Sequence, residues 1–226
     1  SSPPFSRSPK EGDAMDEDVS MSARVSELAR IVRSSKCTDE QAARALHDAH
    51  ERDIAASLGP RPIAVIGARD GDEVGFATVA WATPVSHTPP MVAFALRTKS
   101  HTFGLVRATR RFTISVLDAN LDDAVATVET CGNKTGNVID KSALVDWRLL
   151  PAAEQSAREP LPALAGALTA FECRVDHLDP AGDHMLVIGY VDRAWSRAGS
   201  DERSRIDATD ALLCVQHDLF ATVKLD

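Results

Sequence analysis

Apolar and polar positions alternate in several short runs after residue 60, which is typical of strands with one buried face. The alternation is regular at 112–117 and at 169–177. Other runs predict strands at Ile63–Ala68, Phe76–Trp81, Met91–Leu96, His184–Trp195 and Ala211–Gln216 and helices at 103–110 and 121–131. About six or seven strands with few helices between them favour a mainly β fold with peripheral helices, built as a closed or nearly closed antiparallel barrel.

Changes in composition divide the chain into three parts. Residues 1–20 are rich in Ser and Pro and then acidic, which predicts a disordered tail. Residues 21–59 carry apolar side chains at helical spacing and end at a Gly-Pro pair, so we expect a helical extension there. Residues 60–226 form the main β domain in this interpretation.

The overall charge and the cysteines exclude some classes of function. The formal net charge of −8 argues against nucleic acid as the main partner, although a local cluster of cations could still hold a small anion. The four cysteines form no C-x-x-C pair, and His47 and His50 fit a solvated helix face, so no metal site is expected. No apolar run is long enough to span a membrane, and we expect a cytoplasmic protein with no membrane partner.

One loop carries the side chains of an anion site. The expected strand Met91–Leu96 runs into Arg97, Thr98, Lys99, Ser100 and Thr102, and a helix is expected to begin there. Cationic and hydroxyl groups at a helix N-terminus favour a phosphate, because free backbone N–H groups and the helix dipole both attract it. A stiff polar turn is expected just before the strand, at Thr83–Ser86. No Gly-rich dinucleotide motif, P-loop or G-x-S-x-G elbow accompanies these features.

Further segments place these features in a known pattern. They are RPIAVIGARD (61–70), WATPVSHTPPMVAFALR (81–97), SHT (100–102), RFTISVL (111–117), CGNKTGNVIDK (131–141) and FECRVDHLDPAGDHMLVIGYV (171–191). In order and separation they resemble the flavin reductase-like, FMN-binding split-barrel family. The resemblance implies a Greek-key antiparallel split β-barrel that forms a homodimer, holds FMN near the subunit interface and uses NADH or NADPH as electron donor.

The resemblance also implies roles for individual residues. It places one segment along the edge of the isoalloxazine ring: Trp81, Ala82, Thr83, Pro84, Val85 and Ser86. It assigns the FMN phosphate to a loop with Leu96, Arg97, Ser100, His101 and Thr102, and a capping loop to Gly132, Lys134 and Thr135. His184, in a Gly-Asp-His turn, matches the histidine expected near the flavin or nicotinamide, and is the candidate catalytic residue.

Three functional hypotheses remain open at this point. The first is an FMN-dependent oxidoreductase that transfers hydride from NAD(P)H to flavin and passes electrons to a partner monooxygenase or a small acceptor. The second is an FMN-binding or flavoredoxin-like electron-carrier protein without turnover, supported by Met185 and Ser142, which depart from the family pattern. The third is an interaction protein in which residues 22–58 recruit a partner.

Overall fold

The computed structural model describes residues 58–151, 158–197, 211–216 and 219–221. The predicted tail at 1–20 and almost all of the predicted helical extension at 21–59, including His47 and His50, lie outside these ranges. Within the described ranges, no helix combines the length and apolar character that crossing a membrane requires.

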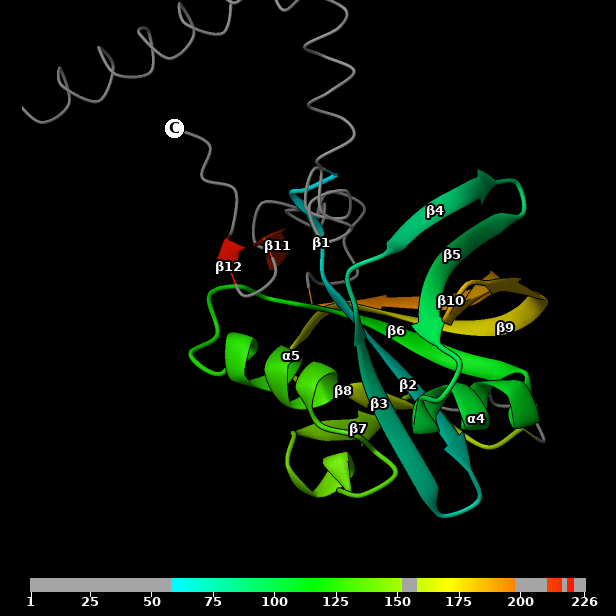
Figure 1. Ribbon diagram of the computed structural model, residues 1–226, viewed down its shortest axis with the longest axis horizontal. Helices are drawn as coiled ribbons and strands as arrows, with labels where there is room; N and C mark the ends of the chain where they lie inside the picture. Colours follow the sequence, from blue (N-terminus) through cyan, green and yellow to red (C-terminus); the bar gives the residue numbers. More distant parts are fainter. Residues whose placement is uncertain (1–57, 152–157, 198–210, 217–218, 222–226) are drawn as a thin grey trace, which may run out of the picture. The chain divides into compact units, whose positions relative to one another are not determined.

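The main structure is an antiparallel sheet of seven strands in the order β3-β2-β6-β9-β10-β5-β4 (Figure 1). The two edge strands, β3 and β4, are consecutive in the chain and are separated only by Ala80 and Trp81. The sheet must therefore curl until its edges approach each other, which confirms the predicted mainly β, split-barrel fold. The strands are β2 Ala64–Asp70, β3 Glu73–Val79, β4 Ala82–His87, β5 Pro90–Arg97, β6 Arg111–Leu117, β9 Ala167–Ala181 and β10 His184–Ser196.

Smaller elements surround this sheet. Helix α4 (His101–Thr109) lies against β2, and helix α5 (Ala124–Asn133) lies against β3 (Figure 1). A short sheet contains β1 (Arg61–Pro62), β11 (Leu213–Gln216) and β12 (Leu219–Ala221). The 3-10 turn η1 (Lys141–Ala143) precedes the hairpin-like pair β7 (Trp147–Leu149) and β8 (Pro162–Leu164).

Two apolar cores cover opposite faces of β2 and β3. Inside the barrel, Phe94 and Phe112 meet edge to face with ring centroids 5.0 Å apart. On the outer face, Val65 and Phe76 pack with Val128 of α5. Because both faces are covered, Ile63–Ala68 reads as a continuous apolar run rather than an alternating one.

The polar positions of β6 are also buried, contrary to the alternation expected for 112–117. Thr113 and Ser115 are almost completely enclosed. Strand β8 covers them: the Thr113 hydroxyl donates to the Pro162 carbonyl, and the Leu164 N–H donates to Ser115 Oγ at 3.1 Å. Each buried hydroxyl thus has a hydrogen-bond partner, which removes most of the cost of its burial.

The predicted turn at Thr83–Ser86 is wrong, because these residues lie in strand β4. The prolines favoured a turn in the prediction, but in the described part of the chain β4 pairs with β5 alone, and an edge strand tolerates a missing N–H donor. A register shift beside Val85 makes a bulge in the strand. Gly132, which the resemblance places in a capping loop, lies instead in the last turn of α5.

Lys141 joins η1 to two other elements from a buried position. Its ammonium donates to the carbonyl of Phe76 in β3 and to the carbonyl of Cys131 in α5. Burial lowers the pKa of Lys141, and burial raises the pKa of the neighbouring Cys131 thiol to about 11. The Lys141 side chain is therefore occupied by the fold rather than presented to a ligand.

A substitution at Gly189 of β10 tests how tightly the barrel interior is packed. An added Cβ would lie 2.7 Å from Phe112 Cζ and 2.8 Å from the Arg174 carbonyl oxygen. Gly189→Ala should therefore lower the free energy of unfolding by about 1–3 kcal/mol, measured by urea denaturation. Gly104→Ala in α4 is the matched control, because nothing lies within 4 Å of its added Cβ. Equal unfolding midpoints for the two variants would contradict this packing.

Replacing Lys141 by Met should lower the free energy of unfolding by about 1–3 kcal/mol, because two buried carbonyls lose their donor. The low pKa of Lys141 in the folded protein means that the unfolded chain keeps this proton to higher pH. Below the pKa that Lys141 has in the folded protein, burial of its charge lowers the free energy of unfolding by the full amount. As the pH rises toward 10.5, the value for the unfolded chain, folded Lys141 loses its proton and the free energy of unfolding rises. The stability difference between wild type and variant should therefore widen as the pH rises toward 10.5. A difference that narrows would refute this.

Candidate functional site

Three of the predicted site residues come together from separate segments. Strands β5 and β10 pair so that His184 stands opposite Arg97. Trp81, just before β4, reaches the same place, and its indole lies 4.9 Å from the His184 ring, centroid to centroid. The end of β5, the start of β4 and the start of β10 thus build one group of an indole, an imidazole and a guanidinium.

His184 is held by its neighbour in the turn between β9 and β10. Gly182 has φ +60°, a conformation that favours glycine, and it lets the chain reverse there. His184 Nδ1 lies 2.6 Å from Asp183 Oδ1, and this hydrogen bond is the main cause that lowers the pKa of Asp183. Arg97 adds a smaller favourable charge. The carboxylate thus fixes the orientation of the imidazole.

The turn that carries His184 is tied to the predicted phosphate loop. The Asp183 carbonyl accepts from the backbone N–H of Thr98 and from its hydroxyl, both at 3.2 Å. Thr98 was part of the predicted anion loop, whereas Asp183 was absent from the predicted site, although it could have been found as the middle residue of the Gly-Asp-His turn. The contact with Thr98 spans 85 residues and leaves no signal in the sequence.

The N-terminus of α4 has the chemistry of an anion site. Ser100 is its N-cap, and Ser100 Oγ accepts from the Phe103 N–H at 3.4 Å. The first turn has no acidic residue, and the leading N–H groups of a helix lack intrahelical acceptors. Arg97 and Lys99 are exposed, and neither makes an ion pair with a residue that the structure describes. A dianionic phosphate fits this set of donors.

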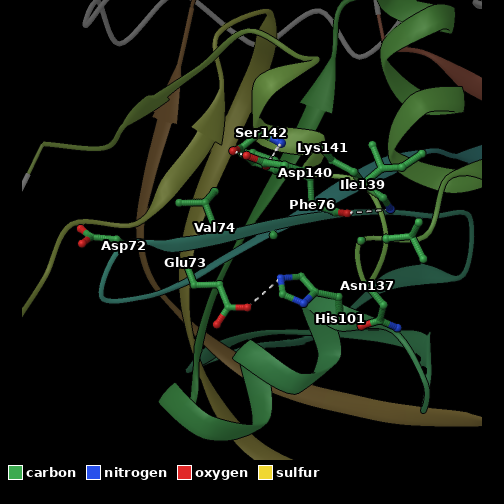
Figure 2. Close-up of a pocket in the computed structure, with 13 residues that line it drawn as sticks. Asp72, Glu73, Val74, Phe76, His101, Asn137, Ile139, Asp140, Lys141 and Ser142 are labelled. Carbon is green, nitrogen blue, oxygen red and sulfur yellow. Dashed lines mark hydrogen bonds and ion pairs between the residues drawn. The ribbon is translucent and has the colours of Figure 1, made fainter.

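Three predicted ligands of the phosphate loop point elsewhere. The side chains of Leu96 and Thr102 are buried, so these residues can offer only backbone groups. His101 turns its ring toward Glu73, with 3.5 Å between Nε2 and Oε1. Figure 2 shows this contact at the edge of a pocket of about 260 Å³, which the loop at 136–142 also lines.

The segment predicted to cap the site contacts the predicted phosphate loop through one hydrogen bond. Gly132 lies in the last turn of α5, and Lys134 and Thr135 follow the helix in exposed positions. Asn137 Nδ2 donates to the Lys99 carbonyl at 3.1 Å and joins the two loops. Nothing in the sequence marked Asn137 for this contact.

Strand β4 presents an open edge next to this group. Thr83, Pro84 and Val85 are exposed, while Ala82 and Ser86 are half-buried. Because β4 pairs only with β5 among the strands that the structure describes, its other backbone groups are available to the polar edge of a planar ligand. The described residues contain no group of three or more His, Cys, Asp or Glu side chains that could hold a metal.

Curated proteins resemble this chain in sequence. A "probable flavin reductase" of Rhizobium meliloti is 30% identical over 131 residues, which are 57% of this chain and 38% of the relative. A "flavin-dependent monooxygenase, reductase subunit HsaB" of Mycobacterium tuberculosis is 32% identical over 123 residues, which are 54% of this chain and 58% of the relative. The chain therefore spans less than two thirds of the length of these curated relatives.

A solved structure matches the fold. The crystal structure of an FMN-binding protein from Thermus thermophilus with bound 1-cyclohex-2-enone is 28% identical, with a TM-score of 0.63 over 73% of this chain and 87% of that one. The family model of the flavin reductase like domain matches residues 57–219, which is well over half of the sequence. The chain therefore belongs to the flavin reductase-like domain family.

Proposed function

We propose that the protein binds FMN and transfers hydride to it from NADH or NADPH. The observation that carries this proposal is the meeting of Trp81, Arg97 and His184 beside the N-terminus of α4. It combines an aromatic surface for a ring with cations and a helix terminus for a phosphate. The family and the FMN-binding relative of known structure support FMN as the cofactor.

Each part of the site has a defined task in this proposal. Arg97, Lys99 and the first N–H groups of α4 bind the phosphate. The open backbone edge of β4 contacts the polar edge of the isoalloxazine, and the loop with Lys134 and Thr135 excludes water. When bound, FMN supplies the hydride acceptor, so no side chain has to be a strong acid or base. The chain contributes position and orientation.

The proposal extends to partners. The relative named as a monooxygenase reductase subunit supports a monooxygenase as the acceptor of reduced flavin, with a small-molecule acceptor as the other route. We further propose a homodimer. The edge strand β4 supports it, because Val85 is 50% exposed there and such apolar surface at a sheet edge is usually covered.

FMN binding without turnover is the alternative, and two side chains favour it. Met185 packs against the barrel core, so the position after His184 offers no hydroxyl to a ligand. Ser142, the other departure from the family pattern, donates its hydroxyl to Asp140 at 2.6 Å rather than to a ligand. This hydrogen bond is the main cause that lowers the pKa of Asp140. Under this alternative the protein stores flavin or carries electrons.

An anaerobic visible spectrum of the FMN-loaded protein separates the two functions. Adding NADH, and NADPH to a second sample, should bleach the flavin bands with at least one donor, because a positioned nicotinamide transfers hydride without further catalytic groups. FMN without protein is the control. Persistent flavin bands with both donors would favour the alternative, and failure to load FMN would reject both.

Arg97→Ala should weaken FMN binding by about 1.5–3 kcal/mol, the contribution of a charged hydrogen bond, measured by fluorescence titration. Arg107→Ala is the matched control, because it removes the same charge from the last turn of α4 rather than from the phosphate loop. Binding that falls equally in both variants would point to a general charge effect, and unchanged binding in Arg97→Ala would reject the phosphate assignment.

A further inference from the structure

We propose that the pocket beside the start of α4 binds the adenosine half of the electron donor, and that its carboxylates select NADH over NADPH. The pocket lies between the β2–β3 hairpin, His101 of α4 and the loop at 136–142 (Figure 2). Trp81, Arg97 and His184 are not among the described residues that line it. The choice of donor deepens the proposed function and rests on it, since there either nucleotide can reduce the flavin.

The pocket has the size and the mixed lining that a nucleoside needs. Its volume of about 260 Å³ is just below the usual range of small-molecule sites, so it suits one half of a dinucleotide rather than the whole. Val74 and Ile139 contribute apolar wall against which a base can pack. Glu73 and Asp140 bring carboxylates to two sides of the pocket, as Figure 2 shows.

Asp140 is held in a fixed orientation that suits a ribose. Its Oδ1 accepts from the Ser142 N–H at 2.9 Å and from the Ser142 hydroxyl at 2.6 Å. The bond from the hydroxyl is the largest cause that lowers the pKa of Asp140, so the group is ionised at neutral pH. A carboxylate has about four acceptor positions, and two of them remain for the 2′- and 3′-hydroxyls. Acidic side chains bind this diol in other NAD sites.

The same carboxylates disfavour a 2′-phosphate. The described lining contains Asp72, Glu73 and Asp140, and its basic groups are already engaged. The Lys141 ammonium donates to two backbone carbonyls, and His101 Nε2 lies 3.5 Å from Glu73 Oε1. A dianionic 2′-phosphate would therefore meet net negative charge. NADPH sites instead place an Arg beside that phosphate.

The wall of the pocket is fixed before a ligand arrives. The His101 ring fits between two glycines of neighbouring segments. A Cβ added at Gly75 of β3 would lie 3.1 Å from His101 Cδ2, and one added at Gly136 would lie 3.0 Å from His101 Cβ. Because these segments already pack closely, little order has to be gained on binding.

The pocket is near enough to the candidate flavin site for one dinucleotide to reach both. His101 follows Arg97 by four residues, so their Cα atoms are at most about 14 Å apart, a distance that an extended dinucleotide bridges. Asn137, which lines the pocket, donates to the carbonyl of Lys99 at 3.1 Å. Lys99 is exposed in the segment between the two sites, and it offers a cation to the pyrophosphate of the donor.

The test uses 5′-AMP and adenosine 2′,5′-bisphosphate, which differ only by the 2′-phosphate and need no turnover. Isothermal titration calorimetry of the FMN-loaded protein, whose phosphate loop is occupied, should show that 5′-AMP binds at least about tenfold more tightly, which corresponds to about 1.4 kcal/mol. NADH should exceed NADPH in the same order, measured as the donor concentration that half-saturates flavin bleaching.

Variants of the carboxylates should narrow this ratio from both sides. D140N should weaken binding of 5′-AMP by about threefold, because an amide is a poorer acceptor for the ribose, and it should tighten binding of the bisphosphate. E73R should bring the bisphosphate to at least the affinity of 5′-AMP, because a guanidinium pairs with a 2′-phosphate. E129Q is the matched control, since Glu129 is exposed in α5 and is not among the described lining residues.

Equal affinity of the wild type for the two probes, or a ratio that E129Q narrows as much as D140N does, would overturn the inference. Displacement of 5′-AMP by FMN would also overturn it, because the probe would then lie in the phosphate loop. So would variants that change the preference between FMN and FAD but not between the donors, since the pocket would then hold the adenosine of the cofactor. Selective binding of 5′-AMP by a protein that does not bind FMN would support the pocket and reject the proposed function. Circular dichroism of each variant confirms that the fold is retained.

Discussion

The two-residue link between β3 and β4 is the constraint on which the rest of this structure depends. The sheet places these strands at opposite edges, so Ala80 and Trp81 can join them only if five intervening strands curve around a common interior. That curvature creates the enclosed core that Phe94 and Phe112 fill. It also brings Trp81 to the ends of β5 and β10. A residue that closes the barrel is therefore also a residue of the candidate site.

Closure also explains which polar groups are buried. Covering both faces of β2 and β6 encloses Thr113 and Ser115. Phe76 lies in the edge strand β3 and Cys131 in the last turn of α5, where backbone carbonyls commonly lack a donor from the sheet or the helix. Lys141 donates to two of those carbonyls. A buried ammonium is costly, but an unsatisfied carbonyl in the same place would be costly as well, and the lowered pKa of Lys141 reflects this balance.

Local pattern predicted most of the strands and the helix that follows Ser100, and it failed where three-dimensional context decides. Pro84 reads as a turn because the sequence does not show that β4 is an edge strand. The family resemblance, not the local pattern, counts His101 in the phosphate loop, yet successive helical residues point about 100° apart, and the His101 ring turns toward Glu73. The Asp183–Thr98 contact joins residues 85 positions apart, and only the pairing of β5 with β10 brings them together.

The character of the site suits hydride transfer better than acid–base chemistry. At the ends of β5 and β10 the carboxylate–imidazole pair of the described residues is Asp183–His184, and the Trp81 indole lies against its imidazole. A general base needs direct access to the proton that it removes. A hydride donor and acceptor need only parallel rings at short range, which a rigid aromatic face, an open strand edge and an anchored phosphate can provide. In the proposed function the barrel contributes fixed surfaces, and the bound flavin supplies the reactivity.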